Sequence, residues 1–159
     1  PDKDTYFTEC SGGDWAKIFA DNLKFNVGTL VIGSTNNWAR GVALWNLALD
    51  EKGGPHKGGC GNCRGVVTID SKTGAYTRNV EYYSLAHASK FVRPGAHRIR
   101  SESADTLLAH VAFLNPDQYT KVLLVLNMAK EARRFVVRSR GGSFRYTLPA
   151  ASVVTLTWS

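Results

Sequence analysis

The sequence predicts an α/β part over residues 1–92, followed by an antiparallel β-sandwich over residues 93–159. Two observations support this division. In the first part, β-favouring and nearly unbroken apolar runs alternate with segments of helical periodicity, as they do in parallel β/α units. After Arg93–Gly95 the sequence breaks into short β-rich runs separated by turn residues, which is typical of a sandwich.

The first strand is expected at Thr5–Thr8, a short β-favouring run that opens into a loop at Glu9. A helix is expected from Trp15 onward, with Asp14 as its N-cap, because apolar residues follow at the spacing of one buried helix face. Those residues are Leu23, Val27, Leu30 and Val31. The next apolar run, Gly41–Leu49, predicts a parallel strand that is covered on both sides.

The segment Asp50–Gly65 holds six glycines and one proline, which predicts a long functional loop. We expect a short strand at Val66–Ile69, its turn at Asp70–Gly74 and a helix over Asn79–Phe91. Six β-rich runs complete the chain, and each predicts a strand: Ala96–Ser101, Leu107–Leu114, Lys121–Asn127, Arg133–Arg138, Ser143–Leu148 and Ser152–Trp158.

The composition is that of a globular chain, since 43% of its 159 residues are hydrophobic and only 21% are charged. The apolar runs are shorter than the ~20 residues of a membrane span, so we expect no membrane-spanning segment. No targeting signal is visible. Because Pro1 stands where an initiator Met would stand, we expect the chain to be the later part of a longer protein.

The formal net charge of +7 raises the question of a nucleic-acid partner. The densest basic stretch, Arg133–Arg145, interleaves its arginines with apolar residues, as strands with one solvated face do. No recognised nucleic-acid motif accompanies this charge. We therefore expect no nucleic-acid partner.

The chain has three cysteines, Cys10, Cys60 and Cys63, and the last two form a C-x-x-C pair in the glycine-rich loop. A local disulfide or structural thiols, a zinc site and a redox motif are the alternatives. Zinc would need two further ligands, of which His56 supplies one at most. A redox motif would normally open a helix, and no helix start follows here.

Three long runs carry a resemblance to a known family: YFTECSGGDW, GVALWNLALDEKGGPHKGGCGNCRGVVTID and RNVEYYSLAHASKFVRPGAHRI. Together they resemble the last two β/α units of glycoside hydrolase family 30, of the glucosylceramidase and endo-β-1,6-glucanase type. The rest of the chain resembles the β-sandwich domain of that family. The resemblance implies the C-terminal part of a (β/α)8 TIM barrel, in which Tyr6–Thr8 and Gly41–Leu49 are the seventh and eighth strands.

In this family the nucleophile lies at the position of Glu9. From the residues alone, a Glu beside Cys and Ser is more often a helix cap or an ion-pair partner than a catalytic residue. A retaining glycosidase needs a second carboxyl group ~5–5.5 Å away. The family keeps that acid/base within an Asn-Glu pair, and this chain contains no Asn-Glu dipeptide. We therefore expect the acid/base in a missing N-terminal portion, and the chain alone to be inactive.

The resemblance also implies four substrate-binding residues. Trp45 resembles the aromatic residue that stacks on the sugar, although core filling is the alternative for a tryptophan in an apolar strand. Asn46 is its neighbour, and Asn62 and Arg64 are candidates for contacts at the rim of the loop. Asp50 and His56 would either join them or hold the loop in shape.

The sequence therefore predicts a retaining β-glycoside hydrolase that acts on the O-glycosidic bonds of β-linked glucans or glucosides, without cofactor or metal. The family also implies an extracellular or periplasmic protein. A non-catalytic carbohydrate-binding or structural β domain with a vestigial barrel piece is the alternative.

Overall fold

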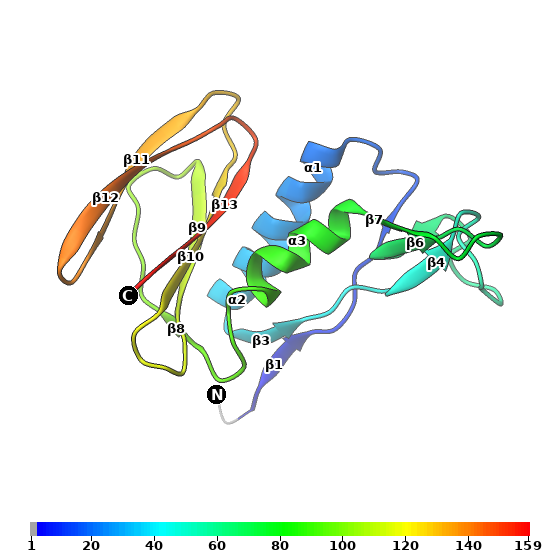
Figure 1. The fold of residues 1–159 in the computed structure, drawn as a ribbon, viewed down its shortest axis with the longest axis horizontal. Coiled ribbons are helices and arrows are strands. Elements are labelled where there is room, and N and C mark those ends of the chain that lie inside the picture. Colours follow the sequence, from blue (N-terminus) through cyan, green and yellow to red (C-terminus); the bar gives the residue numbers. More distant parts are fainter. Residues whose placement is uncertain (1–2) are drawn as a thin grey trace.

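The computed structural model of the chain describes residues 3–159. Its first part begins with a strand, a helical layer and a second strand (Figure 1). The strands β1 (Thr5–Phe7) and β3 (Ala39–Val42) pair in parallel. Between them lie β2 (Gly12–Gly13), the α-helix α1 (Phe19–Lys24), the π-helical segment η1 (Phe25–Gly33) and α2 (Ser34–Asn36). The predicted order of strand, helix and strand is confirmed.

The first helix starts later than predicted. It begins at Phe19, with Ile18 at the N-cap position, so the predicted start at Trp15 and the cap by Asp14 are wrong. The helix starts late because the backbone before it is hydrogen-bonded to residues of the glycine-rich loop. The glycines of β2 pair with β5 (Cys63–Arg64), and the backbone N–H of Asp14 donates to the carbonyl oxygen of Asn62 over 3.0 Å.

The apolar run Gly41–Leu49 does not form one strand, as predicted, because its two ends belong to different sheets. β3 ends at Val42, and the chain then follows the β1 side through hydrogen bonds from Ala43 N to Phe7 O and from Trp45 N to Cys10 O. Further on, β4 (Ala48–Asp50) pairs in parallel with β6 (Val67–Ile69).

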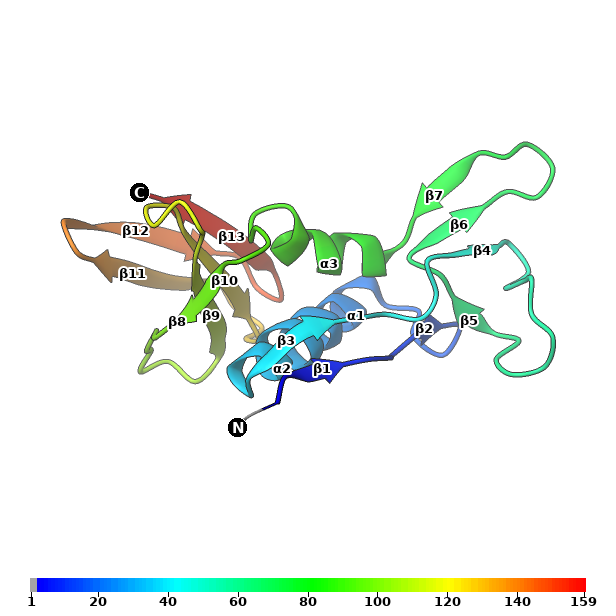
Figure 2. The ribbon, with the colours of Figure 1, turned by 90° about the horizontal axis from the view of Figure 1, so that it is seen from below.

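A small sheet projects at the far end of the molecule (Figure 2). Its strand order is β4-β6-β7, and β7 (Tyr76–Arg78) is a strand that the sequence did not predict. The helix α3 (Val80–Ser89) follows, with Asn79 at the N-cap position, close to the predicted Asn79–Phe91. Within residues 3–159, β1 and β3 form a two-stranded sheet, and no barrel is visible.

All six strands predicted for the second part are confirmed. They are β8 (His97–Ile99), β9 (Leu108–Leu114), β10 (Lys121–Asn127), β11 (Arg133–Ser139), β12 (Gly142–Leu148) and β13 (Val153–Trp158). One antiparallel sheet has the order β13-β10-β9-β8, and β11 and β12 form the second sheet. The two sheets face each other in Figure 2.

The sheet around β9 and β10 is buried on both faces. One face packs on the helical layer through the cluster of Val27, Val31, Ile32, Val111, Phe113, Val122, Leu124 and Leu126. The opposite face packs on β11 and β12 through Leu108, Ala112, Leu123, Val125, Val137 and Leu148. Because successive side chains of a strand point to opposite faces, the unbroken apolar run of β10 serves both clusters. No helix within residues 3–159 has the length and apolar character needed to cross a membrane.

The end of α3 is tied to the sheet by Asn115, which is 1% exposed. Its side-chain nitrogen donates to the carbonyl oxygen of Phe91, and its side-chain oxygen accepts from the N–H of Arg93, both over 3.0 Å. We predict that Asn115→Ala lowers the free energy of unfolding by about 2–3 kcal/mol, because the polar groups lose their partners in a buried place. Urea unfolding would measure this loss.

The matched control is Asn37→Ala, which removes an exposed amide that donates to the carbonyl oxygen of Gly33. We expect this change to cost less than about 0.5 kcal/mol. Equal losses in the two variants would contradict the role assigned to Asn115.

A second polar link joins α3 to β13. The hydroxyl of Thr155 donates to the carbonyl oxygen of His87, so it accepts from Nδ1 of the His87 ring, both over 2.9 Å. Burial lowers the pKa of His87 below its ordinary value of 6.5. The neutral ring is therefore favoured in the folded state. Above pH 6.5 the neutral ring contributes fully to the free energy of unfolding. This contribution is lost as the pH falls through the lowered pKa, because the unfolded chain binds the proton more readily.

We predict that His87→Gln weakens the dependence of stability on pH between about 7.5 and 5. The free energy of unfolding, measured in urea at several pH values, should fall less steeply in the variant than in the wild type. Identical slopes in the two proteins would contradict this assignment.

Candidate active site

The strands β1 and β3 run in the same direction (Figure 2), and Glu9 follows the carboxyl end of β1 by two residues. The backbone continues this alignment past both strands, since Trp45 N donates to Cys10 O over 2.8 Å. The parallel pairing therefore brings the segment of Glu9 and the segment of Trp45 side by side. The carboxylate of Glu9 is exposed and makes no hydrogen bond or ion pair with any residue in the range 3–159.

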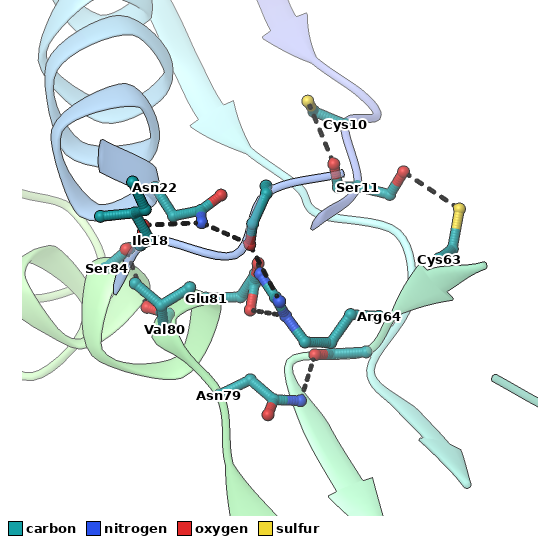
Figure 3. Close-up of polar contacts among 12 residues, drawn as sticks. Cys10, Ser11, Ile18, Asn22, Cys63, Arg64, Asn79, Val80, Glu81 and Ser84 are labelled. Atoms are coloured by element: carbon teal, nitrogen blue, oxygen red, sulfur yellow. Dashed lines mark hydrogen bonds and ion pairs between the residues drawn. The ribbon is translucent and has the colours of Figure 1, made fainter. Parts of the chain in front are cut away.

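The segment after Glu9 is fixed to the glycine-rich loop. Cys60 and Cys63 are joined by a disulfide, so the Sγ of Cys63 can only accept the hydrogen bond of the Ser11 hydroxyl, over 3.4 Å (Figure 3). The pairing of β2 with β5 adds backbone hydrogen bonds at Gly12 and Gly13. Cys10 is a half-buried free thiol that donates a long hydrogen bond to the Ser11 carbonyl oxygen, over 4.0 Å.

Trp45 and Asn46 are both half-buried at the end of the segment that follows β3, and the peptide bond between them is cis. The side-chain oxygen of Asn46 accepts from the N–H of Ala48 over 2.9 Å. Its side-chain nitrogen has no hydrogen-bond partner in the described part of the chain. The side-chain nitrogen of Asn46 is thus free to donate beside Trp45.

The two predicted rim residues lie in different surroundings. Asn62 is exposed, and its backbone oxygen accepts from Asp14. The guanidinium of Arg64 points instead toward α3 (Figure 3). Its Nε and Nη2 donate to the two carboxylate oxygens of Glu81 over 3.1 and 2.8 Å, and its Nη1 donates to the Ala16 carbonyl oxygen over 3.3 Å. All three nitrogens of Arg64 are therefore engaged inside the protein.

The sequence alone assigns no functional role to Glu81. In the fold, its side chain is almost completely buried, with 2% exposed. The one indication in the sequence is its place in the first turn of α3, because acidic residues favour helix N-termini. That signal is common to many solvated helices. Only the fold reveals its arginine partner.

The glycine-rich loop is held in shape by acidic side chains. One oxygen of Asp50 accepts from the backbone N–H of Lys52 and Gly54, over 2.8 and 2.7 Å. Glu51 accepts from the hydroxyl and the N–H of Ser71, and these hydrogen bonds lower the pKa of its carboxyl. Among residues 3–159, no three His, Cys, Asp or Glu side chains gather as metal ligands.

Comparison with known proteins identifies the family. Residues 95–156 match the glycosyl hydrolase family 30 beta sandwich domain. The chain is 34% identical to the endo-1,6-beta-D-glucanase BGN16.3 of Trichoderma harzianum over 98% of its own length and 31% of that protein. It is also 34% identical to the lysosomal acid glucosylceramidase of Mus musculus, over 72% of this chain and 22% of that protein.

A solved structure agrees with these relatives. The endo-beta1,6-glucanase BT3312 superposes with a TM-score of 0.86 at 34% identity, over 99% of this chain and 36% of that one. The chain spans about a third of the length of the two glucanases that it matches. The predicted resemblance and the predicted β-sandwich are thus confirmed, and the chain belongs to glycoside hydrolase family 30.

Proposed function

We propose that this chain is the part of a retaining β-glycoside hydrolase that carries the nucleophile, Glu9. The observation that carries the proposal is the position of this exposed carboxylate at the carboxyl end of β1, beside the segment that leads from β3 to Trp45. Catalytic residues of (β/α)8 barrels lie at the carboxyl ends of their strands. The glucanases and glucosylceramidases among the relatives support the same chemistry.

In this proposal, β1, the helical layer and β3 belong to a (β/α)8 barrel that the full-length protein completes. The parallel pairing of β1 with β3 and the greater length of the relatives support it. Residues 1–92 would then be the C-terminal part of the barrel, and residues 93–159 the β-sandwich domain. The missing N-terminal portion supplies the other strands and the acid/base.

The reaction proceeds by double displacement. A carboxylate oxygen of Glu9 attacks the anomeric carbon, and the bond from that carbon to the leaving oxygen breaks. The acid/base protonates that oxygen, then removes a proton from the water that releases the sugar from Glu9. Proton transfer by such a group contributes about 10²–10⁴-fold to the rate, so the chain alone would be nearly inactive.

The substrate proposed is a β-linked glucan or glucoside, with Trp45 stacked on the sugar and the free side-chain nitrogen of Asn46 donating to a hydroxyl. Asn62 is the proposed contact on the loop. For Arg64 we propose no sugar contact, because each of its three side-chain nitrogens already donates to Glu81 or Ala16. The disulfide between Cys60 and Cys63 supports an extracellular or periplasmic protein, since disulfides persist in oxidising compartments.

We predict that Glu9→Ala in the full-length protein lowers kcat on an aryl β-glucoside by several orders of magnitude, because the covalent intermediate cannot form. Added azide can enter the space of the lost carboxylate and attack from the same face. The product should then be the α-glucosyl azide, which nuclear magnetic resonance identifies.

The control is Glu102→Gln, which changes an exposed carboxylate of the sandwich part. It should retain the activity of the wild type. A β-glucosyl azide from the Glu9 variant would instead assign Glu9 to acid/base catalysis and contradict the proposal.

We predict that Trp45→Ala lowers kcat/KM for the same substrate about tenfold, which corresponds to ~1.4 kcal/mol of lost aromatic contact. Trp45→Phe keeps an aromatic face and should lose less. Trp38→Ala is the control, because Trp38 is exposed at the amino end of β3 and stacks on Arg98. Equal losses at the two tryptophans would contradict a sugar contact at Trp45.

A further inference from the structure

The buried pair of Arg64 and Glu81 has no part in the proposed reaction, yet it lies against the segment that follows Glu9. Glu81 belongs to α3, and Arg64 belongs to β5, which pairs with β2. Their contact is bidentate, a geometry that fixes both the distance and the orientation of the two groups. The side chain of Glu81 is 2% exposed and that of Arg64 25% exposed, so water screens this pair little.

The first link from this pair to the segment of Glu9 passes through Gly12. A Cβ atom added at Gly12 would lie 1.9 Å from Oε1 of Glu81 and 3.2 Å from Nη2 of Arg64. The backbone of Gly12 therefore rests directly on the ion pair, three residues after Glu9. No larger residue fits there unless the pair or the backbone moves.

The second link passes through Ala16. Its carbonyl oxygen accepts from Nη1 of Arg64 over 3.3 Å and from the side-chain nitrogen of Asn22 over 2.8 Å (Figure 3). Asn22 belongs to α1 and also donates to the carbonyl oxygen of Ile18 over 3.0 Å. The contacts of Arg64 thus hold the chain between Gly12 and the start of α1 on the first turn of α3.

We propose that Arg64 and Glu81 are positioning residues, which hold the backbone of Gly12–Ala16 so that Glu9 points at the anomeric carbon. The inference rests on the proposed function of Glu9. A buried ion pair is seldom more stabilising than apolar residues of similar volume, so its value here is orientation. Reacting groups must meet at about 3–3.5 Å, and a displacement of 1 Å can cost on the order of 10²-fold in rate.

The test measures formation of the glycosyl-enzyme in the full-length protein. The probe is 2,4-dinitrophenyl 2-deoxy-2-fluoro-β-glucoside. An oxygen of Glu9 bonds to its anomeric carbon while the bond to the aryl oxygen breaks, and dinitrophenolate leaves as an anion. This leaving group needs no proton, so the rate of labelling reports on the nucleophile and is independent of the acid/base.

We expect Arg64→Met to slow labelling on the order of 10²-fold. Arg64→Lys keeps the charge but loses the bidentate contact, and it should fall between that variant and the wild type. Gly12→Ala should also slow labelling, because its methyl group displaces the loop while both charges remain. The dissociation constant of a competitive thioglucoside should change less than about threefold, since sugar binding does not involve the pair.

The matched control is Asp105→Asn, which weakens the ion pair between Asp105 and Arg133 in the sandwich part. Arg133 is about as exposed as Arg64, at 30% against 25% of the side chain, whereas Asp105, at 31%, is more exposed than Glu81. The control should label at the rate of the wild type, and thermal melting shows how much stability each variant loses. If Arg64→Met does not fold, Arg64→Lys and Gly12→Ala carry the test.

Wild-type labelling rates in the Arg64 and Gly12 variants would overturn the proposal, and so would equal slowing in Asp105→Asn. Failure of the proposed function is a different result. In that case the wild-type protein itself carries no label on Glu9.

Discussion

The burial of β9 and β10 on both faces is the constraint on which the rest of the structure depends. Val27 and Val31 of η1 pack on one face of these strands, and Val137 and Leu148 of the second sheet pack on the other. The helical layer is therefore anchored to the sandwich part through side chains with almost no exposed surface. Since β1 and β3 flank this layer in the chain, the same core determines where the loops beyond them begin.

The site at the end of β1 depends on interactions of another kind. None of its residues belongs to the two apolar clusters, and its loops are held by main-chain pairing, the disulfide of Cys60 and Cys63, and the buried contact of Arg64 with Glu81. Such directional contacts fix orientation better than apolar packing does, because hydrogen bonds weaken steeply when their geometry is lost. This division suits the proposed catalyst, in which the apolar core would supply stability and the polar contacts would orient Glu9.

The sequence predicted the sandwich strands well, because short β-favouring runs are separated by turn residues. The helix over Val80–Ser89 was also predictable, from Asn79 at its start and Pro94 beyond its end. In the segment Gly41–Leu49, by contrast, hydrophobicity alone does not reveal that two sheets share one apolar run. The late start at Phe19 likewise depends on Cys63 and Arg64, whose pairing with the two glycines of β2 is remote in the sequence.

The candidate site was predictable only where it follows local pattern and family resemblance. Glu9 is conspicuous because it follows a short β-favouring run, and Trp45 because it is a large aromatic residue within an apolar run. Glu81 was not conspicuous, because its function in the fold comes from a partner 17 residues away in the chain. Arg64 was assigned to the rim of the loop, since nothing local indicates that its donors turn inward.

The most direct test of Glu9 as the nucleophile is peptide mapping of the full-length protein after reaction with the fluorinated glucoside. Cleavage after lysine releases the peptide Asp4–Lys17, which holds Glu9 together with Asp4 and Asp14. Fragmentation in the mass spectrometer then locates the added sugar. A fluoroglucosyl group on Glu9 is the result predicted here, and a label on any other carboxylate would contradict the account.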